Sequence, residues 1–119
     1  MHRIFGSLLV AAALACTSTL APTHDLSGTW STPILDVGTL MTLTQQGTAL
    51  TGTGTTRNNA SIQSFQVHGS YAPPWVSLTF NYDSGLVCQY TATVQDANDI
   101  AGAETCGGGP QGLTNFSRR

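Results

Sequence analysis

The chain is poor in charge and has no lysine. Only 8% of its 119 residues are charged, and the four basic residues are Arg3, Arg57, Arg118 and Arg119. An ordinary soluble domain carries roughly 25% charged residues. Nucleic-acid binding and attachment to anionic membrane surfaces both need clustered Lys or Arg, so the composition excludes these two classes of protein. The length allows one domain and no more.

Cysteine is also scarce, and its count is odd. The three cysteines are Cys16, Cys88 and Cys106. Two of them can form a disulfide, which leaves the third for a separate role.

The sequence lacks a hydrophobic run long enough to cross a bilayer, which takes about 20 residues. After the positive start Met1-His2-Arg3, the stretch Ile4–Ala15 carries no charge. This stretch has the length of a signal-peptide core, and Ala13 and Ala15 satisfy the small-x-small rule for cleavage. The N-terminus therefore predicts export.

Cys16 follows the small residue directly, and the segment resembles a bacterial lipoprotein signal, although Ala13 stands where that pattern prefers Leu. The resemblance implies a signal peptide at 1–15 and a lipidated Cys16 as the first mature residue. Residues 16–25 would then be the lipidated N-terminus and a short polar tether. Thr17, rather than Asp, implies an outer-membrane lipoprotein of the bacterial cell envelope, facing the periplasm or the cell surface. The alternative is an ordinary secreted protein with Cys16 near the cut by chance.

The mature part reads as a series of short strands. Threonine is abundant, no helical apolar period occurs, and Gly, Pro, Asn and Asp interrupt the chain at short intervals. The predicted strands are Leu26–Thr32, Val37–Gln45, Thr48–Thr55, Ile62–Tyr71, Trp75–Tyr82, Leu86–Gln95, Asp99–Cys106 and Gly112–Ser117. Short strands with short connections predict an all-β domain over 26–119: an antiparallel up-and-down meander of about eight strands, closed into a small barrel.

Cys88 and Cys106 fall in consecutive predicted strands. A three-residue loop, Asp96-Ala97-Asn98, would pair Gln95 with Asp99, and counting outward then places the two cysteines directly opposite each other. Cross-strand neighbours are within reach of a disulfide, and export leads to an oxidising compartment. We expect Cys88 and Cys106 to pair. Two free buried thiols are the alternative, and no metal site is expected, because zinc needs three or four ligands.

The segment Leu26-Ser27-Gly28-Thr29-Trp30 resembles the Gly-x-Trp start of the calycin barrels, which include lipocalins and avidins. The resemblance implies that Trp30 plugs one barrel end and that an Arg of the last strand, Arg118 or Arg119, packs over it. Trp75 is a candidate for a ligand-stacking Trp. Biotin binding is not implied, because Thr32 and Gly54 replace an Asn and an aromatic residue of the avidin site.

Glu104 stands out among the carboxylates, because the other five fall in expected turns or in the tether. In the predicted register Glu104 shares the phase of Cys106 and lies opposite Tyr90. If this phase faces the interior, Glu104 is a polar anchor in an apolar pocket, with Tyr90 beside it. If Glu104 lies at the open barrel end, it is solvated.

We find no nucleophile with a base and an orienting group, no phosphate loop and no cofactor motif, so we do not expect an enzyme or a cofactor. Two functions remain open. The barrel of a membrane-anchored lipoprotein binds a small, mainly apolar ligand through Glu104, Tyr90 and Trp75. Alternatively, the barrel is filled and serves as a protein-binding module of the envelope, either an inhibitor or an assembly subunit.

Overall fold

We describe the protein from a computed structural model, which describes residues 23–33, 38–58 and 60–119. The predicted signal peptide, Cys16 and the first part of the predicted tether lie outside these residues. Within them there is no helix that is long and apolar enough to cross a membrane.

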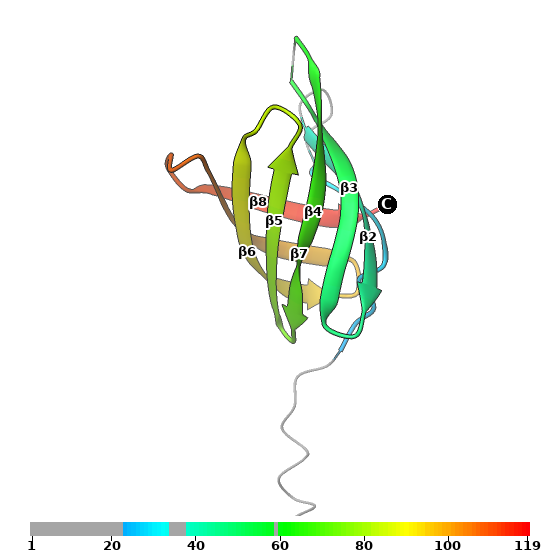
Figure 1. Ribbon diagram of the computed structural model, residues 1–119. Coiled ribbons are helices and arrows are strands. Elements are labelled where there is room, and N and C mark those ends of the chain that lie inside the picture. The colour runs from blue at the N-terminus through cyan, green and yellow to red at the C-terminus, as the bar shows by residue number, and fades with distance from the viewer. Residues whose placement is uncertain (1–22, 34–37, 59) are drawn as a thin grey trace, which may run out of the picture.

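The strands close into a barrel in the order of the chain (Figure 1). They are β1 (Gly28–Ser31), β2 (Gly38–Gln46), β3 (Ala49–Arg57), β4 (Ile62–Ala72), β5 (Trp75–Tyr82), β6 (Val87–Asp96), β7 (Asp99–Cys106) and β8 (Gly112–Arg118). Every neighbouring pair is antiparallel, including β1 with β8. The predicted all-β meander closed into a small barrel is confirmed.

The first strand is shorter than predicted, because before Gly28 hydrogen bonds to side chains take the place of the backbone hydrogen bonds between β1 and β2. The Leu26 amide donates to Gln45 Oε1 (2.8 Å), and the Gln45 amide donates to Ser27 Oγ (2.9 Å). The preceding residues also contact the barrel: the His24 amide donates to the Tyr71 hydroxyl (3.2 Å). The chain therefore packs against the barrel before β1 begins.

The predicted loop between β6 and β7 is wrong, although the predicted register is right. Asp96 pairs with Asp99, so the turn has two residues, and the register shifts between Val94 and Asp96. The shift leaves Gln95 without a ladder partner. Beyond it, Cys88 faces Cys106 as predicted, because the shorter turn and the shift compensate each other.

Side chains fill the barrel interior. The fully buried aromatic residues are Trp30, Phe65, Tyr71, Phe80, Tyr90 and Phe116. The rings of Phe65 and Phe80 have centroids 5.0 Å apart, and those of Tyr90 and Phe116 lie 5.4 Å apart edge to face. Close packing of this kind leaves the interior to the protein's own side chains, as eight-stranded barrels commonly do.

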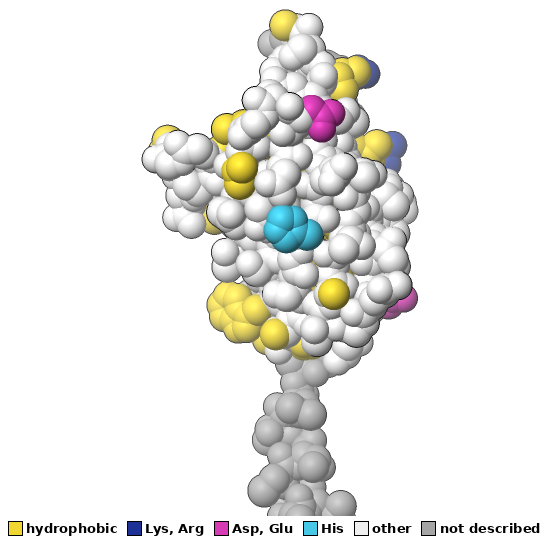
Figure 2. Space-filling model, viewed as in Figure 1, with side chains coloured by type: hydrophobic (Ala, Val, Ile, Leu, Met, Phe, Trp, Pro, Cys, Tyr) yellow, Lys and Arg dark blue, Asp and Glu magenta, His cyan; other side chains and the backbone are white. Residues whose placement is uncertain are grey.

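The two ends of the barrel differ. The lower end in Figure 1, at the β2–β3 hairpin, we call the closed end. Leu26 lies there beside Gln45, and the fully buried Trp30 donates its indole N–H to the Leu26 carbonyl (3.0 Å). At the upper end lie the β3–β4 hairpin and the β5–β6 turn. We call the upper end the mouth. The face shown in Figure 2 carries few charged side chains.

Candidate ligand site at the open end of the barrel

A pocket of about 320 Å³ opens at the mouth, above the aromatic core. It is lined by Thr32, Pro33, Gly38, Thr39, Thr56, Glu104, Leu113, Thr114 and Asn115. The strands β2, β3, β7 and β8 contribute to it: Thr39, Thr56, Glu104 and Thr114 lie on the inward phase of their strands, and the outward-phase residues Leu113 and Asn115 of β8 belong to its rim. Glu104 is the only charged residue among the described lining residues. We refer to this cavity as the mouth pocket.

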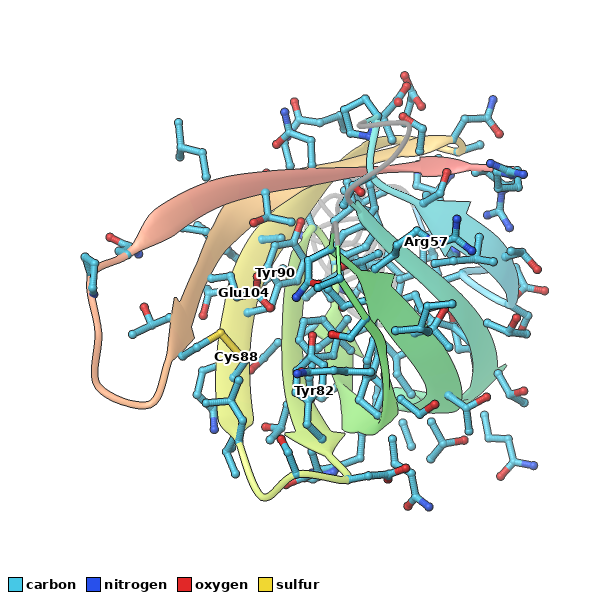
Figure 3. The ribbon with its side chains drawn as sticks, turned by 90° about the horizontal axis from the view of Figure 1, so that it is seen from above. Arg57, Tyr82, Cys88, Tyr90 and Glu104 are labelled. Atoms are coloured by element: carbon cyan, nitrogen blue, oxygen red, sulfur yellow. A yellow bond between two sulfur atoms is a disulfide. The ribbon has the colours of Figure 1, made fainter. Side chains whose placement is uncertain are left out.

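Glu104 sits partly buried in β7, with Tyr90 of β6 as its cross-strand partner. Figure 3, which looks into the mouth, shows Glu104 close to Tyr90 on the inner side of the sheet. Burial raises the pKa of the Glu104 carboxyl above its usual value of 4.5. Within the described part of the chain its carboxylate makes no hydrogen bond, so it is free to bind a ligand group that enters the pocket.

Three hydroxyl groups form a chain beside the pocket. The hydroxyls of Thr39 and Thr56 are 3.0 Å apart, and the Tyr82 hydroxyl lies 2.7 Å from that of Thr56. Burial raises the pKa of Tyr82, and the negative charge of Glu104 adds to this, while the hydrogen bond from Thr56 opposes it. The Tyr82 phenol therefore stays neutral, and the chain offers oxygen acceptors to a ligand.

Tyr90 belongs to the core below the pocket. Its side chain is fully buried, and its hydroxyl donates to the Thr114 carbonyl (2.8 Å). Burial, with a further contribution from the charge of Glu104, raises its pKa far above the usual value of a phenol. The Tyr90 hydroxyl thus links β6 to β8 below the pocket, and ligand contact by Tyr90 stays a prediction.

The predicted disulfide is present beside the pocket. Cys88 and Cys106 are bonded, with their Cα atoms 4.1 Å apart. Their sulfur atoms and a Glu104 oxygen lie within 4.8 Å of one another. This cluster does not provide a metal site, because sulfur in a disulfide is no longer a thiolate ligand.

Trp75 lies away from the mouth. Its side chain is 59% exposed on the outer face, near the turn between β4 and β5. It borders a groove of about 420 Å³ across β5–β8 that also contains Ala101, Ala103 and Leu113. We call this the outer groove. In β5 and β7 the odd-numbered side chains face outward and the even-numbered side chains face inward. Trp75 therefore lies on the outer face and Glu104 on the inner face, and the two do not share a site.

At the closed end the pair expected from the calycin resemblance is in contact. The Arg118 guanidinium lies 4.4 Å from the Trp30 ring centroid, a cation–π distance. It also donates to the carbonyls of Ser27 (2.7 Å), Asp25 (2.8 Å) and Ala97 (3.0 Å). Arg118 therefore ties the segment before β1 to the last strand.

The mouth pocket brings one carboxylate and several hydroxyl groups together. The described lining provides one carboxylate but no nucleophile with a base beside it, a combination that hydrolysis by side chains would need. His68 is on the outer face, within 3.3 Å of Asn81. The hydroxyl chain was missed by our sequence reasoning, although Tyr82 shares the inward phase of its predicted strand and could have indicated it.

The comparisons with known proteins concern the fold. No protein-family model and no curated protein matches the chain. A solved structure, described as a redesigned β-barrel, is similar with a TM-score of 0.65 and 16% identity, over 79% of this chain and 90% of that one. At this identity the likeness shows a small β-barrel fold alone.

Proposed function

We propose that this protein is a membrane-anchored lipoprotein of the bacterial envelope whose barrel binds a small ligand at its mouth, without catalysing a reaction. The observation that carries the proposal is the mouth pocket of about 320 Å³ over a filled core. Ligand sites are concave and mostly apolar, with a few convergent polar groups. Glu104 and the hydroxyl chain are such groups, and Pro33 supplies apolar wall.

The filled core changes where the ligand lies. A mainly apolar ligand inside the barrel would have to displace aromatic side chains such as Phe80 and Phe116, which are fully buried. A cavity at the mouth needs no such displacement. The ligand is therefore small, and its polar end is the part that reaches Glu104.

Native mass spectrometry tests ligand binding. A soluble Cys16→Ser form is purified from envelope extract, and its spectrum is compared with that of the same form carrying Glu104→Gln. We expect a bound small molecule on the first protein and less of it on the second. Asp83→Asn removes a carboxylate from the exposed turn at the same end of the barrel and serves as the control. Equal loading of all three proteins would contradict binding at the mouth.

The anchor is supported by the sequence of the N-terminus. Cys16 follows an uncharged core that ends in Ala13-Leu14-Ala15. Several acyl chains on one residue would anchor the protein stably without a spanning helix. Cells fed an alkyne-tagged fatty acid should label the full chain in the membrane fraction, and Cys16→Ser should abolish both label and retention. Unlabelled full chain in the soluble fraction would favour the secreted alternative.

The outer groove favours a second candidate function, a protein-binding module. Trp75 is 59% and Leu113 92% exposed, and the residues that line the groove carry no charge. Exposed Trp in an apolar depression is typical of interface anchors. The partner would present an uncharged apolar segment. Crosslinking in the envelope through a photoreactive residue at Ala103 should trap one defined partner, and Trp75→Ser should remove that product. No crosslinked product in the unchanged groove would rule this function out.

A further inference from the structure

We propose that the mouth pocket recognises a primary ammonium group on a short apolar chain, with Glu104 as its counter-charge. This inference rests on the proposed function and adds the chemical class of the ligand. Two sources share this chemistry: a free alkylamine and the side chain of a lysine in a peptide.

The charge of the pocket fits a cation. Glu104 is the only ionisable group among its described lining residues. Arg57 and Arg119 line a neighbouring pocket, which shares Thr32, Gly38 and Thr39 with the mouth pocket, and neither arginine lines the mouth pocket itself. Figure 3 shows Arg57 on the other side of the mouth from Glu104. A partly buried carboxylate without a partner cation is costly, and a ligand cation that entered beside it would offset this cost.

The remaining polar groups fit a donor-rich head. An ammonium has three N–H donors and no acceptor, so it needs oxygen acceptors around it. The pocket offers the carboxylate of Glu104 and the hydroxyl oxygens of Thr39 and Thr56. The Thr39 and Thr56 hydroxyls already share one hydrogen bond and retain free lone pairs.

The apolar wall fits a short chain. Pro33 contributes apolar surface to the lining, whereas Leu113, which is 92% exposed on the outward phase of β8, reaches only the rim. A cavity of about 320 Å³ is at the small end of ligand sites, which span roughly 300–1,000 Å³. This space suits a chain of a few methylene groups, such as the side chain of lysine.

Binding should depend on pH in a direction set by Glu104. The pKa of its carboxyl lies above 4.5 in the free protein, and a bound cation would lower it. Affinity should therefore be full at neutral pH and should fall as Glu104 takes up a proton in acid. A neutral ligand of the same shape would not show this loss.

Two-dimensional NMR on the soluble Cys16→Ser form tests the proposal. The probes are hexylammonium and Nα-acetyl-lysine methylamide, with hexanol and hexanoate as uncharged and anionic counterparts. We expect an ammonium probe to shift amides at the mouth, such as those of Thr56 and Glu104, and to bind at least about tenfold more tightly than hexanol. Stronger binding of the lysine derivative indicates a peptide source, and stronger binding of hexylammonium indicates a free amine.

Matched variants separate this inference from the proposed function. Glu104→Gln should lower the affinity for the ammonium probes about tenfold and leave the affinity for hexanol unchanged. Asp83→Asn should change neither affinity. If hexanol binds the mouth as tightly as hexylammonium, the ammonium inference fails and the proposed ligand site stands. If no probe and no envelope-derived molecule shifts the mouth amides, both fail.

Discussion

Arg118 joins three parts of the chain at the closed end of the barrel. Its guanidinium donates to the carbonyls of Ser27, Asp25 and Ala97 and stacks on Trp30. The planar guanidinium presents several donors in a fixed fork, which a lysine ammonium does not. The contact expected from the Gly-x-Trp start is thus present. The three carbonyl contacts could not have been read from the sequence, because they depend on where the β6–β7 turn and the segment before β1 lie beside β8.

Replacing Arg118 should destabilise the fold. We expect Arg118→Ala to lower the free energy of unfolding by about 2 kcal/mol, because it removes a cation–π contact and charged hydrogen bonds that are partly solvent-exposed. Arg118→Lys should lower the free energy of unfolding by a smaller amount. Urea denaturation measures both, with Arg119→Ala as the control. Equal stability of the Arg118→Ala and Arg119→Ala proteins would show that these contacts do not stabilise the fold.

Glu104 should make stability depend on pH. Because burial raises its pKa in the folded state, the folded protein holds more protons than the unfolded one between the two pKa values. Stability attributable to this group therefore falls as pH rises through that window and stays lower at neutral pH. Glu104→Gln should raise the free energy of unfolding at pH 7 by less than about 1 kcal/mol, because solvent reaches the group. The gain should disappear below pH about 4.

Urea titrations of both proteins at several pH values measure this difference. Asp83→Asn is the control for a change of net charge at the same end. A Glu104→Gln gain that is the same at pH 4 and pH 7 would contradict desolvation as its cause.

At the scale of the strand, glycine decides where the ladders approach closely. A Cβ at Gly69 in β4 would collide with the Ser77 carbonyl and Leu78 Cα of β5, which are backbone atoms and cannot rotate away. We expect Gly69→Ala to lower the free energy of unfolding by more than about 2 kcal/mol. Gly112→Ala is the control, since a Cβ there meets nothing within 4 Å. Denaturation midpoints that are equal for the two variants would contradict this view of the β4–β5 packing.

The disulfide acts on the β6–β7 hairpin. Cys88 and Cys106 are 18 residues apart, and by the chain-entropy model a loop of this size contributes about 3 kcal/mol. The double variant Cys88→Ala, Cys106→Ala should unfold at lower urea and should ignore added reductant. The unchanged protein should lose stability only when reductant is present. Unchanged midpoints on reduction would mean that the strand pairing alone holds the hairpin.

The elements were largely predictable, and their ends were not. Alternation of apolar and polar residues in Trp75–Tyr82 marks a half-buried strand, and the structure gives that strand the same bounds. The turn after β6 was misread, because local sequence does not show whether Gln95 enters the ladder. The start of β1 was misread for a similar reason: Ser27 and Gln45 bond through their side chains, and residue type alone does not show that choice.

At the scale of the molecule, the sequence predicted a closed barrel but left open whether it was hollow. The same apolar phase serves a filled core and a ligand cavity equally well, and only the packing of rings such as Phe80 and Tyr90 decides between them. The predicted register set Glu104 opposite Tyr90, as the structure has it, and left open which way this phase faces. The position of Glu104 at the rim depends on how far along β7 the core extends. The alternation of apolar and polar residues in the sequence does not give that distance.

The barrel closes where β1 pairs with β8, and this pairing, which we call the seam, is the shortest between neighbouring strands. Strands β1 and β8 share two residue pairs, whereas β3 and β4 share nine. Outside the ladder, the Arg119 amide donates to the Thr29 carbonyl (2.8 Å) and the Arg118 amide to that of Asn98 (2.8 Å). Proteins open locally where few bonds and contacts resist opening. We therefore expect the barrel to open first between β1 and β8.

Hydrogen exchange followed by NMR measures this opening. The Arg119 amide at the seam should exchange about 100-fold faster than amides in the middle of β3, such as that of Thr53, a difference typical of local rather than global opening. Arg118→Ala should speed exchange at the seam further, since the side chain that ties β8 to the segment before β1 is gone. At conditions where only local opening contributes, it should leave Thr53 unchanged. Equal protection at both places would mean that the barrel opens only by global unfolding, and that the guanidinium contacts replace the missing ladder pairs in full.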